Sequence, residues 1–164
     1  MRQTTLATSL TVLMLIAPTL VRAAGDNPGK SPAATPAPDT ASPAKEPDHI
    51  TIQHVLVGFK GSVPGKDITR TFDEAKKLAE EIFERAKKGE DFEALVKRYT
   101  DDAAPGIYSM ANNGVAAGPG EYPRNRMVPA FGDAGFPLAV GGIDMAPYDK
   151  ARSPYGWHIV KRLK

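Results

Sequence analysis

A β-strand is predicted at residues 50–57, ITIQHVLV, where successive side chains alternate between two faces. Ile50, Ile52 and His54 share one face with Leu56. The second half of the stretch is apolar on both faces, which is typical of a strand covered on either side by other elements. We therefore expect this strand in the middle of a sheet.

The chain also ends on a strand pattern, from Trp157 to Leu163. Its odd-numbered apolar residues point one way, whereas His158 and Val160 point the other. If this strand pairs antiparallel with residues 50–57, His54 and His158 can lie side by side on one face. A histidine in a strand is more often a packed core or edge residue than a catalytic one, so the spacing alone leaves both roles open.

Helices are predicted between these strands. Thr71 has the features of an N-cap, because Glu74 follows three residues later. The apolar positions then recur at helical spacing: Ala75, Leu78, Ala79, Ile82, Phe83 and Ala86. Gly89 is expected just beyond the end of this helix. A shorter helix is expected from an N-cap at Asp91, with Phe92, Leu95, Val96 and Tyr99 on its buried side.

Residues 101–125 are rich in Gly, Pro, Asn and Ala without a sustained period, which predicts a loop with a short strand near Glu121 and Tyr122. A brief helix with Pro129 in its first turn follows. Another strand is expected at Ile143 to Ala146. This order of strands, helices and strands predicts an α+β domain with an antiparallel sheet.

The first 48 residues differ in composition from this domain. Arg2, an apolar run from Leu6 to Val21 and small residues at 23–25 are typical of a secretory signal peptide, which we place at residues 1–23. An uncleaved membrane anchor is the alternative, which Pro18 and the Thr and Ser residues of the run disfavour. Residues 24–48 are Pro- and Ala-rich and read as a disordered linker. The folded domain is expected at residues 49–164, exported to the periplasm or the cell exterior, without a stable membrane span once the signal is cleaved.

The composition excludes several classes of function. The 164 residues include no cysteine, which rules out disulfides, thiolate metal sites and thiol nucleophiles. The net charge of +2 gives no reason to expect a nucleic-acid partner. The three histidines, at 49, 54 and 158, match no metal-ligand spacing, so we expect neither a metal nor another cofactor.

Five short motifs occur in the order found in one enzyme family. They are residues 52–57, the helix from Thr71, residues 89–95 (GEDFEAL), residues 127–131 (MVPAF) and residues 153–161 (SPYGWHIVK). Together they resemble the parvulin family of peptidyl-prolyl cis-trans isomerases. The resemblance implies an α+β, FKBP-like fold in which a four-stranded antiparallel sheet is surrounded by about four helices, with the active site in a groove on the sheet.

The resemblance also implies site residues. His54 and His158 match the paired histidines at the base of the family's groove, and Ser153 matches a hydroxyl residue near the second histidine. Asp102 falls where parvulins place a Cys or Asp beside the reacting peptide, with Asp101 as the alternative if the motif shifts by one residue.

Substrate-binding residues follow from the same resemblance. Met127 and Phe131 match the residues that hold the proline ring. The family's Gly-Asp-Leu-Gly-x-Phe segment is replaced here by residues 117–122 (AGPGEY), in which Pro119 and Tyr122 become the expected pocket wall. The loop after the first strand has no adjacent pair of arginines, so selectivity for phosphorylated substrates is not implied.

The resulting expectation is a monomeric isomerase that acts on Xaa-Pro bonds in exported or unfolded, proline-containing polypeptides. The altered segment between residues 103 and 122 keeps a second possibility open, a parvulin-like chaperone or peptide-binding module without catalysis. A hydrolase that uses Ser153 and a histidine is a weaker third possibility, because Ser153 lies in a Pro-containing turn without the context of a nucleophile.

Overall fold

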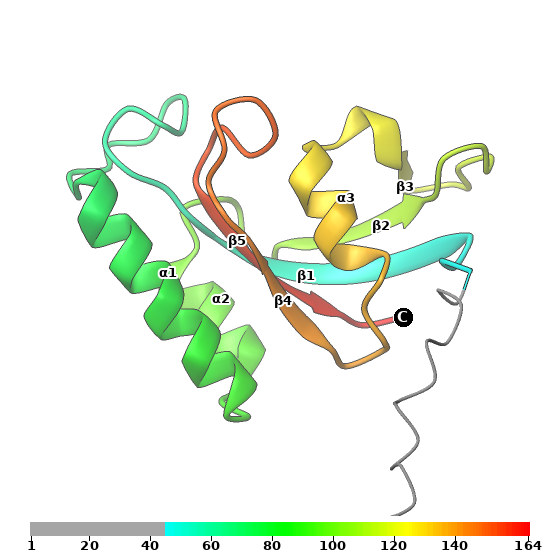
Figure 1. The fold of residues 1–164 in the computed structure, drawn as a ribbon, viewed down its shortest axis with the longest axis horizontal. Helices are drawn as coiled ribbons and strands as arrows, with labels where there is room; N and C mark the ends of the chain where they lie inside the picture. Colours follow the sequence, from blue (N-terminus) through cyan, green and yellow to red (C-terminus); the bar gives the residue numbers. More distant parts are fainter. Residues whose placement is uncertain (1–44) are drawn as a thin grey trace, which may run out of the picture. The chain divides into compact units, whose positions relative to one another are not determined.

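A computed structural model describes residues 45–164 and shows an α+β domain built on one five-stranded sheet (Figure 1). The spatial order of the strands is β3-β2-β1-β5-β4. The strands are β1 (His49–Val57), β2 (Ile107–Ala111), β3 (Glu121–Pro123), β4 (Ile143–Ala146) and β5 (Trp157–Arg162). All neighbours pair antiparallel except β2 and β3, which are parallel. The first predicted strand is therefore the central one, as expected.

The register of β1 and β5 fixes which residues share a face. His54 lies opposite Val160 and Leu56 lies opposite His158, so the two histidines are diagonal neighbours on the same side of the sheet. The predicted juxtaposition of the last strand with residues 50–57 is confirmed.

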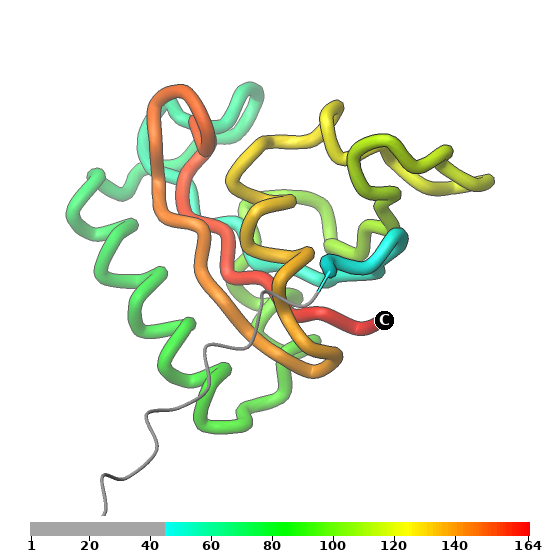
Figure 2. Tube along the Cα trace, turned by 45° about the vertical axis from the view of Figure 1, so that its right-hand side comes forward, coloured from blue at the N-terminus to red at the C-terminus, as the bar shows by residue number. Residues whose placement is uncertain are grey.

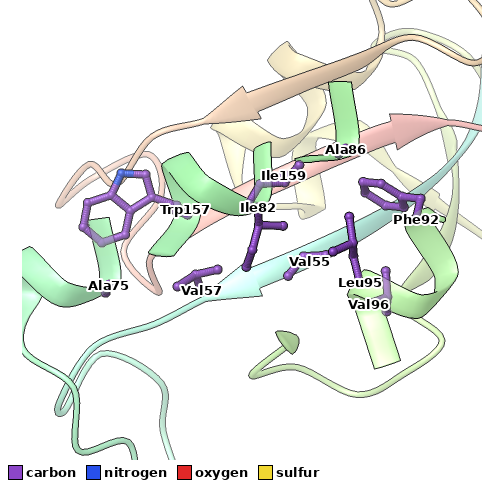
Figure 3. Close-up of a cluster of buried hydrophobic side chains, with 11 residues drawn as sticks. Val55, Val57, Ala75, Ile82, Ala86, Phe92, Leu95, Val96, Trp157 and Ile159 are labelled. Atoms are coloured by element: carbon purple, nitrogen blue, oxygen red, sulfur yellow. The ribbon is translucent and has the colours of Figure 1, made fainter. Parts of the chain in front are cut away.

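Helices cover both faces of the sheet. They are α1 (Phe72–Lys87), α2 (Phe92–Tyr99) and α3 (Pro129–Gly135), with a 3-10 turn η1 (Arg124–Arg126) before α3. Side chains of α1 and α2 pack against Val55, Val57 and Ile159 on one face (Figure 3). Side chains of α3 pack against Ile52 and Val160 on the other. Figure 1 shows α1 and α2 together on one side of the sheet and α3 on the other.

The start of α1 follows the predicted capping box. The Thr71 side chain accepts a hydrogen bond from the Glu74 amide, and the Glu74 carboxylate accepts one from the Thr71 amide. Gly89, just beyond the end of the helix, adopts a φ of 90°, which an L side chain rarely tolerates. The shorter helix from Asp91 and the helix that begins with Pro129 are confirmed as well.

The prediction that residues 101–125 form a loop with only a short strand near Glu121 and Tyr122 is wrong in one respect. Residues 107–111 form β2, which pairs with β1, whereas the sequence pattern predicted loop. β3, near Glu121 and Tyr122 as predicted, adds a fifth strand at the edge beyond β2. The described residues thus contain five strands and three α-helices instead of the four strands and about four helices of the expected fold.

The predicted signal peptide and most of the predicted linker lie outside the described residues. The domain's contacts nevertheless begin before residue 49. The Arg124 guanidinium donates to the Glu46 carboxylate over 2.6 Å, and the Asn112 amide donates to the Asp48 carbonyl over 2.8 Å. Within residues 45–164, none of the helices combines the length and the apolar character needed to cross a bilayer.

Candidate active site

A cavity of about 300 Å³ opens above the centre of the sheet. Its lining side chains come from β1, the loop after β1, the α2–β2 turn, β2, α3 with the residues before it, and the last turn with β5. They are His54, Leu56, Val63, Pro64, Asp102, Tyr108, Met127, Val128, Phe131, Tyr155 and His158. Most of these are apolar, and the polar groups are two imidazoles, one carboxylate and two phenol hydroxyls.

The two histidines form a buried pair beneath this cavity. Their Nδ1 atoms are 3.1 Å apart, and their rings lie nearly parallel, with centroids separated by 5.3 Å. On its other side, the Nε2 atom of His54 is 3.2 Å from the Asp102 carboxylate. His54 and His158, which lie in strands and are 104 positions apart, thus form one hydrogen-bonded chain with Asp102 of the turn before β2.

The direction of these hydrogen bonds follows from what each group can donate. A carboxylate only accepts, so the Nε2–H of His54 donates to Asp102. With both imidazoles neutral, Nδ1 of His54 then accepts from the Nδ1–H of His158. Nε2 of His158 then carries no proton. It is a buried acceptor without a hydrogen-bond partner among the described residues.

The protonation of this chain is biased by burial and hydrogen bonding. Burial lowers the pKa of the His158 imidazole to about 3, and the neighbouring His54 adds to the shift. The hydrogen bond from His54 holds the pKa of the Asp102 carboxyl well below its usual range. At neutral pH the Asp102 carboxylate on one side of His54 is therefore an anion, and His158 on the other side is neutral.

Tyr108, a residue of β2, joins the hydrogen-bonded chain of Asp102, His54 and His158. Its hydroxyl donates to the Asp102 carboxylate over 2.9 Å. Burial, and then this hydrogen bond, raise the pKa of Tyr108 to about 12, so the phenol keeps its proton at neutral pH. Tyr108 thereby helps fix the orientation of the Asp102 carboxylate.

Phe131 of α3 forms the apolar side of the site nearest the histidines. Its ring meets His54 edge-to-face at a centroid distance of 4.8 Å, and His158 at 5.4 Å. Met127 and Val128, just before α3, continue this side of the cavity. An apolar group that enters here would contact the ring of Phe131 close to both imidazoles.

A family model for the PPIC-type PPIASE domain, the peptidyl-prolyl cis-trans isomerase domain of parvulin type, matches residues 40–164. The chain belongs to this family. The parvulin resemblance inferred from the five sequence motifs is thereby confirmed.

Relatives of this isomerase domain include folding factors. A foldase protein PrsA from Geobacillus sp. is 34% identical over 120 residues, which are 72% of this chain and 39% of that protein. A chaperone SurA from Pseudomonas fluorescens is 28% identical over 116 residues, 71% of this chain and 23% of that protein. This chain therefore spans well under half the length of these curated relatives.

A solved structure supports the parvulin-type fold. The solution structure of TbPIN1 matches with a TM-score of 0.54 and 26% sequence identity, over 71% of this chain and 98% of that chain. The α+β fold class expected from the sequence is thereby confirmed.

The structure brings five of the expected site residues of the isomerase domain together. His54, His158, Asp102, Met127 and Phe131 all line the cavity. Of the two alternatives at the turn, the geometry favours Asp102. The Asp101 carboxylate accepts instead from the Gly58 amide and pairs with Arg70, and Asp101 does not line the cavity.

The other three expected site residues lie outside the cavity lining. Ser153 is fully buried, and its hydroxyl donates to the Gly156 carbonyl over 2.7 Å. That bond holds the turn before β5, and the hydroxyl is not placed to act as a nucleophile on the cavity's contents. Pro119 and Tyr122 are exposed, and Tyr122 reaches the site only through its neighbour Tyr108, at a ring-centroid distance of 6.0 Å.

Sequence reasoning missed six lining residues of the isomerase domain: Leu56, Val63, Pro64, Tyr108, Val128 and Tyr155. The alternation of Tyr108 and Met110 within residues 107–111 could have revealed β2, but the Gly- and Asn-rich surroundings obscured it. Val63 and Pro64 lie in an irregular loop, where periodicity carries no signal.

Replacing Asp102 by asparagine should lower the stability of the isomerase domain at pH 7 by about 1 kcal/mol, the usual worth of hydrogen bonds to a charged group reduced for partial exposure. The pKa of Asp102 is lowered on folding, so the carboxylate stabilises the fold above its unfolded pKa of about 3.9, and this contribution is lost as the pH falls further. Urea unfolding at pH 7, 5 and 3 should show a difference between wild type and variant that is present at pH 7 and 5 and smaller at pH 3.

Asp67, an exposed residue, provides the control for this measurement. Asp67→Asn should change the free energy of unfolding by less than about 0.5 kcal/mol at each pH. A difference between wild type and Asp102→Asn that is the same at all three pH values would contradict the stabilising role of the Asp102 charge.

Proposed function

We propose that this protein accelerates the cis-trans exchange of Xaa-Pro bonds in unfolded or newly exported polypeptides. The single observation that carries the proposal is the hydrogen-bonded pair of His54 and His158 directly beneath an apolar cavity edged by Phe131. Membership of the isomerase family and the relatives named foldase and chaperone support the same activity. The signal-like pattern of residues 1–23 supports export.

The chemistry needs no bond to break. Rotation about a peptide bond faces a barrier of about 18 to 20 kcal/mol, because resonance gives the C–N bond partial double-bond character. In the twisted amide this resonance is lost and the carbonyl is less polarised. A site that binds the twisted form better than either planar isomer therefore lowers the barrier. A reduction of about 7 kcal/mol corresponds to roughly 10⁵-fold acceleration.

The residues divide this task between them. Met127 and Phe131 hold the proline ring and remove water from the imide, which disfavours its polar, planar form. The network of Asp102, His54 and His158 places a fixed negative charge and fixed imidazole dipoles beside the cavity, and their field favours one orientation of the substrate's carbonyl dipole. Ser153 and Pro119, which the parvulin resemblance suggested for the site, have no direct part in this proposal.

Exchange spectroscopy by NMR tests the proposed activity. Peptides of the form Ala-Ala-Xaa-Pro-Ala, with Xaa varied among apolar, basic and acidic residues, exchange between isomers over tens to hundreds of seconds when free. Added protein should produce exchange cross-peaks for at least one peptide. Unchanged exchange rates for the whole panel would overturn the isomerase proposal.

A chaperone or peptide-binding module without catalysis is the second candidate. The observation that favours it is the segment 117–122, which leaves Pro119 and Tyr122 outside the cavity where the parvulin resemblance expected a wall. Peptide-induced shifts of the cavity residues without faster isomer exchange would favour this candidate.

A further inference from the structure

The loop between β1 and α1, residues 58–71, supplies a wall of the cavity through Val63 and Pro64. Both views show this loop standing apart from α3 (Figures 1 and 2). The loop folds back onto Gly58 so closely that a β-carbon there would lie 2.7 Å from Val63 Cγ2 and 2.9 Å from Ile68 Cδ1. The place of the Val63 side chain therefore depends on the place of the Gly58 backbone.

Two charged side chains hold that backbone. The Gly58 amide donates to the Asp101 carboxylate over 2.7 Å, and the Arg70 guanidinium donates to the Gly58 carbonyl over 3.1 Å. Arg70 also pairs directly with Asp101. The side chains of Arg70 and Asp101 are only 28% and 13% exposed, so water screens this pair less than a surface ion pair.

The Arg70–Asp101 pair is also connected to the turn that carries Asp102, a polar lining residue of the cavity. Asp101 precedes Asp102, and its amide donates to the carbonyl of Leu56, a lining residue of β1, over 2.9 Å. The Thr100 hydroxyl accepts from the amides of Leu56 and Asp102. The turn that carries the Asp102 carboxylate is thus fixed to β1 and, through Asp101, to the loop that carries Val63.

We propose that Arg70 and Asp101 are positioning residues that hold the Val63–Pro64 wall at a fixed distance from Asp102 and the histidine pair, and so set the affinity of the cavity for an Xaa-Pro segment. This inference rests on the proposed function. The wall lies against the substrate in the planar and twisted states alike. Its displacement therefore weakens binding of both equally, which raises KM and leaves kcat nearly unchanged.

Replacing Arg70 by methionine tests the proposal, because methionine retains most of the side-chain length and loses all donors to Gly58 and Asp101. We expect KM for Xaa-Pro exchange to rise about tenfold, with kcat within about twofold of wild type. Arg70→Lys keeps a charged donor and should recover part of the loss.

Arg85→Met is the matched control. Arg85 is 26% exposed, similar to Arg70, and pairs with the Glu90 carboxylate over 2.7 Å. Neither Arg85 nor Glu90 lines the cavity. The control should therefore keep both KM and kcat, even where the thermal midpoints of Arg85→Met and Arg70→Met fall by similar amounts.

A second variant moves the same wall without touching the ion pair. The Ser62 hydroxyl accepts from the Phe59 amide over 2.9 Å and donates to the carbonyl of Tyr155, another lining residue, over 2.8 Å. Ser62→Ala should raise KM about threefold with kcat unchanged, because the loss of these hydrogen bonds loosens the tip of the loop.

Amide exchange of Gly58 and peptide titration give readouts that do not depend on catalysis. In Arg70→Met the Gly58 amide should exchange with deuterium faster than in wild type, and the Kd for an Xaa-Pro peptide, from chemical-shift titration, should rise as KM does. An unchanged Kd in a folded variant, or a loss of kcat alone, would overturn the positioning role. Wild-type protein that binds the peptide without accelerating exchange would refute the isomerase activity, and the titration would still decide whether Arg70 positions the wall.

Discussion

Replacing Phe131 by alanine should lower kcat/KM for Xaa-Pro exchange by about 100-fold per folded molecule, the loss typical of an aromatic anchor removed from a binding pocket. The ring of Phe131 contacts both imidazoles and lines the cavity. Under the proposed function, its removal takes away the main apolar partner of the proline ring. The same side chain is 2% exposed and belongs to the core under α3. The variant should therefore also lose about 3 to 5 kcal/mol of stability.

Phe136→Ala separates these two effects. Phe136 is fully buried in the same core cluster as Phe131, but it does not line the cavity. It should lose a similar amount of stability and keep the turnover of the folded fraction. Activity is measured by exchange NMR at low temperature, with the folded fraction taken from circular dichroism. Phe131→Leu and Phe136→Leu are the milder pair for the case in which the alanine variants unfold.

Equal turnover per folded molecule in Phe131→Ala and Phe136→Ala would contradict the binding role of Phe131. The ring would then be a core residue that happens to border the cavity. A selective loss in Phe131→Ala, with a rise in KM, is the outcome expected if the ring holds proline.

The second large effect is a loss of stability at acid pH. Burial lowers the pKa of His158 to about 3, below the value of about 6.5 for an exposed histidine. Between these values the unfolded chain binds a proton that the folded chain does not, so stability is complete above about pH 6.5 and falls as the pH decreases. The slope should approach about 1.4 kcal/mol per pH unit, which amounts to a loss of roughly 2 to 3 kcal/mol between pH 6.5 and 4.5.

His158→Asn tests this explanation of the acid sensitivity. The asparagine amide can still donate to His54, but it cannot titrate. Urea unfolding between pH 6.5 and 4.5 should show a smaller pH slope for this variant than for wild type, because the carboxylates that gain protons at the acid end of this range are the same in both proteins. A wild-type slope in His158→Asn would contradict the assignment.

The sequence was most informative where the chain is regular. The alternation of residues 50–57 predicted the central strand, and the Thr71–Glu74 pair predicted the start of α1. The same alternation predicted that His54 and His158 could share a face, which the 3.1 Å contact confirms. These features follow from local periods of two and of 3.6 residues, which a sequence displays directly.

The remainder depended on tertiary contacts that have no local signature. β2 is a strand because β1 offers it an edge, even though its flanks are rich in turn-forming residues. Asp101 and Asp102 are neighbours with the same side chain, yet one braces Gly58 and the other faces the cavity. The hydroxyl of Ser153, which precedes the second histidine of the motif by five residues, donates to the Gly156 carbonyl within its own turn. Spacing fixes none of these distinctions.

The most direct test of the proposed site is a nuclear Overhauser measurement on the protein mixed with an Xaa-Pro peptide that it exchanges. If the proline ring occupies the cavity, its Cγ and Cδ protons should show intermolecular contacts to the Met127 methyl group and the Phe131 ring, in the same sample that shows accelerated exchange. Accelerated exchange with proline contacts confined to residues outside the cavity would contradict the site, and contacts in the cavity without acceleration would contradict its catalytic role.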